Sequence, residues 1–305
     1  MHTSIPTNGT TVYRGREERP VRPLVRLAVV AAYIFLLFLC EVAIVGALGV
    51  VVPPLRAVLL EPDLSKGTGR ALAAQLLATL AVLAAVYVGR RTLDGRSFVS
   101  LGLEPAQALA HLATGILIGG LLGLVVPVAL LLQGAVLRPG GEAPAAVVAA
   151  LAIMAAGAFG EEVLFRGYVL ANLEEEWGTP AAIIGSALLF ACARLLNPYA
   201  DLWAFAGSLA LGVALAVLLV AFRSLWLTVG YHAAWNVVTG PLFGLPVSGL
   251  PAASLWSLGS EQNAPLWLSG GAFGPAASLV ALAVHLTVAA GILLHLYGIY
   301  RRRST

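Results

Sequence analysis

Long apolar runs, separated by short polar stretches that hold most of the charged residues, are the feature that most restricts how this chain can fold. A run of about 18 apolar residues is long enough to cross the hydrocarbon core of a bilayer as a helix. Of the 305 residues, 59% are hydrophobic and only 11% are charged, which is too little charge to cover the surface of a soluble domain. The chain is therefore expected to be an all-α polytopic membrane protein.

Eight apolar segments predict about eight transmembrane helices that enclose a polar intramembrane site. They cover about residues 27–52, 71–88, 112–132, 145 to the NLEEEWGTP stretch, 181–196, 202–222, 225–239 and 276–300. In the third segment, Gly115, Gly119 and Gly123 recur every four residues, a spacing that lets a neighbouring helix approach closely. Two connections are expected to be irregular, namely a solvated loop at Glu174 to Glu176 and a Gly-, Pro- and Ser-rich stretch over 240–271.

The basic residues predict the orientation, because eight spans put both termini on one side of the membrane. That side holds twelve basic residues, which are the five N-terminal arginines, Arg90, Arg91, Arg96, Arg223 and the three C-terminal arginines. The opposite side holds four, which are Arg56, Lys66, Arg70 and Arg138. Since cytoplasmic loops carry an excess of Arg and Lys, both termini are expected in the cytoplasm.

The same clustering accounts for the net charge of +3 without a nucleic-acid partner. Arginines gathered at chain ends and in short loops are a topological signal of a membrane protein. The expected partner of this kind is the lipid bilayer, and the Ala-, Leu- and Arg-rich usage suggests a prokaryotic cytoplasmic membrane.

The stretch GEEVLFRGYV, residues 160–169, places three ionisable groups inside the fourth span. A charged side chain at the bilayer centre costs about 2.5–3.5 kcal/mol, so the helix must be sheltered and its charges paired. Glu162 and Arg166 lie about 40° apart on an α-helix and are expected to form a structural ion pair. Glu161 lies about 140° from Arg166 and is left for another task. The alternative is a purely structural pair at a cytoplasmic helix end.

Two later spans carry polar residues of their own. His232 and Asn236 lie on one face of the seventh span, and Phe190 and Arg194 on one face of the fifth. A carboxylate, an imidazole and an amide from three apolar helices can meet around one polar cavity. Such a cavity could hold water or a metal ion, with glutamate as general base and histidine as ligand or acid/base.

Three motifs resemble those of the intramembrane CAAX prenyl protease and bacteriocin-processing family, also called the CPBP or Abi-like family. EEVLFR (161–166) resembles its EExxxR motif, HAAWN (232–236) resembles HxxxN, and FACAR (190–194) stands where FxxxH is usual. Stretches 224–236 and 240–249 are also similar to bacterial members. The likeness divides the chain into a cytoplasmic tail (1–24), N-terminal transmembrane helices (25–144), a CPBP-like core (145–249), and a long loop with the last helix and a basic tail (250–305).

The resemblance implies an intramembrane metalloendopeptidase, a hydrolase that acts on hydrophobic or prenylated peptides or on membrane-protein substrates. Glu161 would activate the water that attacks the peptide bond, while Glu162 with Arg166 would brace the helix. His232 would bind a metal or polarise the peptide carbonyl, and Asn236 would help to stabilise the oxyanion. The implied metal is a divalent ion such as zinc, with Glu161 and His232 as its ligands.

Arg194 departs from the family pattern, which has histidine at this position. Arginine is always cationic and has no lone pair for a metal, so a divalent ion should bind poorly or not at all. In one reading, Arg194 stabilises the oxyanion while Glu161 alone activates water. In a second, Arg194 forms a salt bridge with Glu161 that weakens the base, which leaves a pseudoprotease of scaffold or bacteriocin-immunity type. In a third, Arg194 reaches past Asn197 and Pro198 to the membrane interface.

Overall fold

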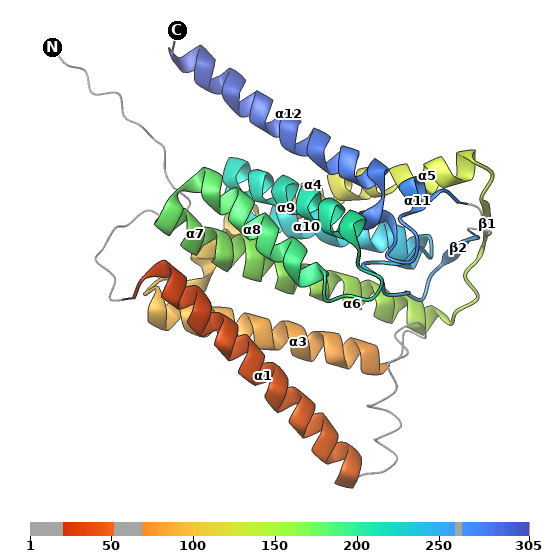
Figure 1. The fold of residues 1–305 in the computed structure, drawn as a ribbon, viewed down its shortest axis with the longest axis horizontal. Coiled ribbons are helices and arrows are strands. Elements are labelled where there is room, and N and C mark those ends of the chain that lie inside the picture. The colour runs from red at the N-terminus through yellow and green to blue at the C-terminus, as the bar shows by residue number, and fades with distance from the viewer. Residues whose placement is uncertain (1–20, 52–68, 260–263, 305) are drawn as a thin grey trace, which may run out of the picture.

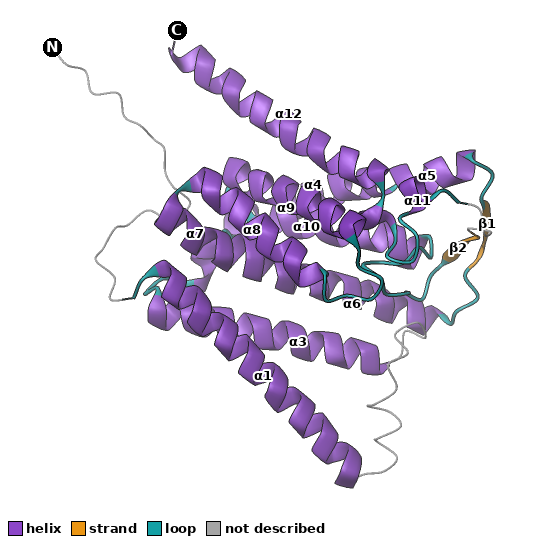
Figure 2. Cartoon of the chain, viewed as in Figure 1, coloured by secondary structure: helices purple, strands orange, loops and turns teal. Residues whose placement is uncertain are grey.

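The computed structural model describes residues 21–51, 69–259 and 264–304, and these are mostly helical (Figure 2). Most of the expected N-terminal tail, and most of the connection between the first two expected spans, lie outside the described residues. In chain order the elements are α1 (Pro23–Val51), α3 (Gly69–Val88), η2 (Gly89–Leu93), η3 (Phe98–Leu101), η4 (Pro105–Gln107), α4 (Ala108–Gly123), α5 (Val125–Leu132), β1 (Val136–Pro139), α6 (Pro144–Glu162), η5 (Val163–Val169), α7 (Leu170–Trp177), α8 (Thr179–Arg194), α9 (Leu202–Phe222), α10 (Leu225–Val237), η6 (Val238–Leu242), β2 (Trp256–Gly259), α11 (Leu266–Ser269), η7 (Pro275–Ala277) and α12 (Leu279–Ser304).

The chain is an all-α polytopic membrane protein, as expected. Within the described residues, 6 helical segments are long and apolar enough to cross a bilayer, and they are 23–40, 72–93, 105–132, 144–177, 202–222 and 279–298. The beginning of α1 and the end of α12 lie at one end of the bundle (Figure 1). Which end faces the cytoplasm stays a prediction from the basic residues.

The expected count of eight full spans is not reached, because the fifth and seventh expected spans are shorter than a bilayer. They correspond to α8, with 16 residues, and α10, with 13 residues. At 1.5 Å per residue, α10 is about 20 Å long, whereas the hydrocarbon core is about 30 Å thick. Most residues of α10 are buried, so it is an inner helix surrounded by longer ones.

Helix α10 lies backbone against backbone with α4, as the glycine spacing predicted. A β-carbon at Gly115 would overlap backbone atoms of Leu227, and one at Gly119 would overlap those of Tyr231. On the opposite side of this contact, a β-carbon at Gly230 would overlap the backbone around Leu112. Glycines on both helices therefore set the position of α10, which carries two of the expected site residues.

The prediction of a loop at Glu174 to Glu176 is wrong, because these residues belong to α7, although Glu175 and Glu176 are exposed as expected. Glu174 is buried, and its Oε1 accepts a hydrogen bond of 2.6 Å from the hydroxyl of Thr179. Glu175 Oε1 lies 3.2 Å from Nη1 of Arg26, a buried arginine of α1. The acidic run therefore continues the helix, because distant partners in the fold compensate its charge.

A set of polar residues, all of them buried except Ser100 and Glu175, joins α1, η2, η3, η5 and α7, and we call it the helix-end cluster. Its members are Arg26, Arg90, Asp94, Ser100, Tyr168, Asn172 and Glu175. Asp94 is its central anion, since Oδ2 lies 2.7 Å from Arg90 Nη1 and Oδ1 lies 3.8 Å from Arg26 Nε. The Tyr168 hydroxyl donates to Asp94 Oδ1 at 3.4 Å.

The long connection after α10 is more ordered than its composition predicted. It contains η6, β2 and α11, and β2 pairs with β1 in an antiparallel sheet whose register runs from Val136 opposite Gly259 to Pro139 opposite Trp256. The two strands lie at the end of the bundle away from the start of α1 (Figure 2). Four-residue strands this far apart in the chain leave no periodic signal in the sequence.

Candidate functional site

Two of the three motif-bearing helices, α6 and α10, continue into a wider, π-helical turn within or directly after the motif. Helix α6 ends at Glu162 and continues as the π-helix η5, and α10 ends at Val237 and continues as the π-helix η6. Together α6, η5 and α7 form a rod of 34 residues, with Glu161 near its middle. Single π-helical turns are rare and occur frequently at functional sites.

Glu162, Arg166 and His232 form a fully buried group at the back of the site. Arg166 Nη1 lies 3.3 Å from Glu162 Oε1, so the expected ion pair is present. The same carboxylate oxygen lies 2.9 Å from His232 Nδ1 and fastens α10 to α6. All three side chains have 0% exposure, and burying either charge without the other would be costly.

Arg194 lies at the centre of the site and contacts three other side chains. Its Nη2 lies 2.6 Å from Glu161 Oε2 and 3.1 Å from His232 Nε2, and its Nη1 donates to the hydroxyl of Ser248. The side chain of Arg194 is only 7% exposed. The reading in which Arg194 reaches to the membrane interface is therefore wrong, because the guanidinium is held inside the bundle.

These contacts fix which ring nitrogen of His232 carries the proton. A carboxylate only accepts hydrogen bonds, so Nδ1 donates to Glu162. A guanidinium only donates them, so the lone pair of Nε2 accepts from Arg194. With these two hydrogen bonds His232 is a neutral imidazole, and its ring links Glu162 to Arg194.

The ring of Phe190 contacts both guanidinium groups of the site. Arg166 lies 4.2 Å and Arg194 4.8 Å from the ring centroid, each at a cation–π distance. The ring of His232 meets Phe190 edge-on, with centroids 6.0 Å apart. The aromatic residue of the FACAR motif therefore provides a cation–π contact for each of the two cations.

Glu161 and Asn236 complete the set of expected site residues. The side chain of Glu161 is 37% exposed, in contrast to its neighbour Glu162, and it lies 3.6 Å from His232 Nε2. Asn236 is buried one helical turn beyond His232. Within the described parts of the chain, its side-chain amide forms no hydrogen bond that joins it to the other site residues.

The residues at this point do not fit a divalent metal. In the described ranges, no group of three or more His, Cys, Asp and Glu side chains is arranged to hold an ion. Zinc sites need at least three protein ligands, and here only Glu161 lies near Nε2 of His232, because Glu162 is already paired with Arg166 and with Nδ1 of the same ring. The guanidinium of Arg194 already contacts both of these side chains, and its fixed charge repels a cation.

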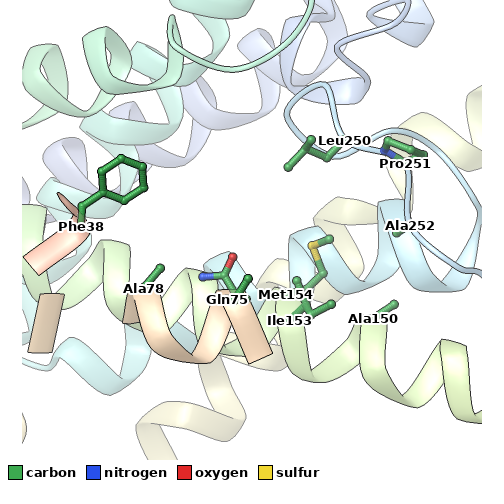
Figure 3. Close-up of a pocket in the computed structure, with 10 residues that line it drawn as sticks. Phe38, Gln75, Ala78, Ala150, Ile153, Met154, Leu250, Pro251 and Ala252 are labelled. Carbon is green, nitrogen blue, oxygen red and sulfur yellow. The ribbon is translucent and has the colours of Figure 1, made fainter. Parts of the chain in front are cut away.

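An apolar pocket of about 280 Å³ lies beside the site, between α1, α3, α6 and the loop after η6 (Figure 3). Its lining residues are Phe38, Ala74, Gln75, Ala78, Ala150, Ile153, Met154, Leu250, Pro251 and Ala252. Met154 precedes Glu161 by about two helical turns on the same face of α6, or about 10 Å along the axis. On the opposite wall, Leu250 follows Ser248 by two residues. The pocket wall therefore lies about two turns of α6 from Glu161 and two residues of chain from Ser248.

The fold and the site together define an integral membrane protein with a carboxylate, a guanidinium and an imidazole gathered inside its helix bundle. Residues 143–238 match the family model described as type II CAAX prenyl endopeptidase Rce1-like. This match confirms the resemblance drawn from the motifs, and that family is a protease family. No curated protein matched the sequence.

Ser248 is the contact residue that the motifs did not predict. It lies outside the matched range, in the stretch 240–249, whose similarity to bacterial family members gave no role to this residue. A Ser-Gly pair between apolar residues, as in LPVSGL, is a turn signal that could have drawn attention to it. No spacing rule, however, links residue 248 to residue 194.

Proposed function

We propose that this protein is an intramembrane endopeptidase that cleaves a peptide bond of a membrane-associated substrate without a metal ion. Glu161 is the general base, and Arg194 stabilises the oxyanion. The observation that carries the proposal is the position of the Arg194 guanidinium, 2.6 Å from Glu161 Oε2 and 3.1 Å from His232 Nε2. The general base and the group that stabilises the oxyanion are thus adjacent, as hydrolysis of a peptide carbonyl requires.

Glu161 has the access and the free oxygen that a general base needs. Its contacts with Arg194 and His232 both use Oε2. Oε1 can therefore accept a proton from water while Oε2 stays paired. With 37% of the side chain exposed, water and a peptide can reach it, which is not true of the buried Glu162.

Arg194 has donors left for a developing negative charge. A guanidinium carries five N–H groups, and three are engaged by Glu161, His232 and Ser248. Its Nε is buried and has no hydrogen-bond partner within the described chain. A buried unpaired donor costs about 1–3 kcal/mol, which an oxyanion would recover in the transition state.

The reaction then follows the usual course of amide hydrolysis. Glu161 takes a proton from water as the water oxygen bonds to the carbonyl carbon, and the carbonyl oxygen becomes an oxyanion beside Arg194. When the carbon–nitrogen bond breaks, Glu161 returns its proton to the leaving amine. Glu162 and Arg166 keep His232 in its tautomer, and Asn236 is a further donor close to the oxyanion.

The pocket beside the site suggests the class of substrate. Its walls are apolar except for Gln75, and they begin about two turns of α6 from Glu161. An apolar side chain or a prenyl group next to the scissile bond is the chemistry that such walls accommodate. We therefore propose hydrophobic or prenylated peptides, or membrane proteins, as substrates.

The second candidate is a catalytically inactive relative that binds hydrophobic peptides or partner helices. The 2.6 Å bond between Arg194 and Glu161 favours it, because a paired carboxylate is a weaker base. The missing third metal ligand favours it as well. In this case the same pocket and charges serve binding only.

Cleavage of fluorogenic peptides, with and without a prenyl group, by protein in liposomes separates the two candidates. We expect activity in the wild type and a loss of roughly 10²–10⁴-fold in Glu161→Gln, since general-base catalysis contributes about that much. Glu142→Gln, at an exposed carboxylate in the loop before α6, is the matched control and should keep full activity. Activity that appears only in Arg194→His would show a decayed enzyme instead.

Metal analysis of the purified protein tests the cofactor separately. Wild type should retain no stoichiometric zinc after dialysis, because the guanidinium competes with the ion. Arg194→His would provide a third ligand beside Glu161 and His232, and we expect it to bind one zinc per chain. Stoichiometric zinc in the wild type would contradict the metal-free mechanism.

A further inference from the structure

The loop after η6 places one residue, Ser248, against the guanidinium of Arg194. Ser248 is buried, and its hydroxyl accepts a hydrogen bond from Arg194 Nη1. The two residues are 54 positions apart in the chain. Of the three acceptors around Arg194, this one alone belongs to a loop and not to α6 or α10, so the loop takes part in setting the position of the guanidinium.

Ser248 lies in a two-residue hairpin turn with an uncommon backbone. Val247 and Leu250 exchange backbone hydrogen bonds of 2.9 and 3.1 Å and flank the turn. The two central residues have positive φ, 53° at Ser248 and 81° at Gly249, as type I′ turns require. Asn, Asp and Gly dominate the first central position because they tolerate this region, whereas serine is strained there.

The turn is held firmly in place, so the hydroxyl is a fixed acceptor. The backbone N–H of Gly249 donates to the carbonyl of Phe273 at 2.9 Å. A β-carbon at Gly249 would overlap the carbonyl of Pro198, so the turn packs directly on the loop that follows Arg194. Strained residues that persist in a well-held segment cluster at functional sites.

We infer that Ser248 is a positioning residue for Arg194, an inference that rests on the proposed function of the site. Its hydroxyl engages Nη1 and leaves Nη2 to reach Glu161 and His232. A strained serine is retained where glycine or asparagine would suit the backbone better because the hydroxyl oxygen is needed at that point. Because Leu250 lies in the same turn and in the pocket wall, the turn also connects the substrate pocket to the cation.

Two substitutions at Ser248 and one matched control test the inference. Ser248→Gly removes the acceptor and relieves the strain, and Ser248→Asn restores an acceptor in a residue that tolerates positive φ. The control is Arg223→Gly, which makes the same backbone change at φ 56°, at the exposed end of α9. Melting temperature in detergent, kcat and KM on the cleaved peptide are measured for each.

We expect Ser248→Gly to melt no lower than the wild type while kcat falls on the order of tenfold to a hundredfold, as for a misplaced catalytic group. KM should change little, because the contact acts on the transition state. Ser248→Asn should recover most of kcat, and Arg223→Gly should keep all of it. Unchanged kcat in Ser248→Gly, or a loss that follows a lower melting temperature, would overturn the inference.

A double-mutant cycle on melting temperature keeps this result separate from the fate of the proposed activity. Ser248→Gly is made in the wild type and in Arg194→Ala, and its effect on melting is compared in the two backgrounds. If Ser248→Gly shifts the melting temperature by different amounts in the wild type and in Arg194→Ala, the contact between the two residues is supported. This holds even if no peptide is cleaved, and then only the proposed function fails. Equal shifts would show that Ser248 and Arg194 do not interact.

Discussion

The molecule contains two buried clusters of charge, and they differ in how completely their polar atoms are paired. In the helix-end cluster, both oxygens of Asp94 have partners, and Arg90 also donates to Ser100 at 2.9 Å. In the site, Arg166 has buried nitrogens without hydrogen bonds, as do Arg194 at Nε and Glu162 at Oε2, within the described chain. Both clusters include carboxylates of the same 34-residue rod, namely Glu161 and Glu162 in the site and Glu175 in the helix-end cluster.

This difference distinguishes a cluster that holds helices together from one that leaves donors for a ligand. Buried polar groups in native proteins are nearly always paired, and exceptions need a reason. A satisfied network stabilises the fold, whereas an unsatisfied one costs stability unless substrate or water completes it. Stability should therefore depend mainly on the helix-end cluster, and turnover mainly on the site.

The largest effect is expected at Asp94, whose replacement tests the structural half of this contrast. Asp94→Asn removes the carboxylate charge beside the buried Arg90 and one of the two beside Arg26, and we expect a loss of about 3–5 kcal/mol in the free energy of unfolding. Chemical denaturation in detergent micelles measures it. Glu104→Gln, an exposed acid in the same connection, is the control and should change little. If Asp94→Asn were about as stable as the wild type, the helix-end cluster would not stabilise the fold, and the difference drawn between the two clusters would not hold.

A smaller loss is expected at Tyr168, which contributes one hydrogen bond to the same cluster. Tyr168→Phe removes the hydroxyl that donates to Asp94 at 3.4 Å. We expect the free energy of unfolding to fall by about 0.5–1.5 kcal/mol. The same denaturation experiment measures it, and cleavage per folded molecule should not change. Reduced turnover at unchanged stability would mean that the helix-end cluster also serves the site.

The smallest effect on stability is expected at Glu161, although it forms the shortest ion pair of the site. Glu161→Gln should lose less than about 1 kcal/mol, because a side chain with 37% exposure is partly screened by solvent. Thermal unfolding in the same detergent measures it, together with the loss of cleavage described above. A loss as large as that of Asp94→Asn would indicate that Glu161 is a structural residue.

Local features of the structure were predictable from the sequence, and long-range ones were not. The span 202–222 agrees with α9 at both ends, because Pro198 and Asp201 precede it and Arg223 follows it. The pair of Glu162 and Arg166 follows from helical spacing alone. The partners of Arg194 are 33, 38 and 54 residues away, and sequence reasoning could only offer three readings of them.

Two other predictions differ from the structure for physical reasons of the same kind. The acidic run at Glu174 to Glu176 is expected from the sequence to be a loop, because Arg26, which pairs with Glu175, lies on a helix near the start of the chain. The count of eight spans is not confirmed, because α8 and α10 are short; most of α10 is enclosed by other helices, whereas α8 keeps exposed apolar residues such as Ile184 and Leu189. Apolar length predicts that a segment avoids water, but not whether lipid or protein surrounds it.

The contact of α10 with α4 has a consequence for any attempt to isolate the segment that matches the family. Residues 143–238 carry the family likeness, yet Gly115 and Gly119, against which α10 packs, lie outside them. Arg26, which pairs with Glu175 on the same rod as Glu161, lies outside them too. The matched stretch is therefore not an independent module: excised from its neighbours, it would lose the helix surface that orients its histidine and the arginine that compensates its acid.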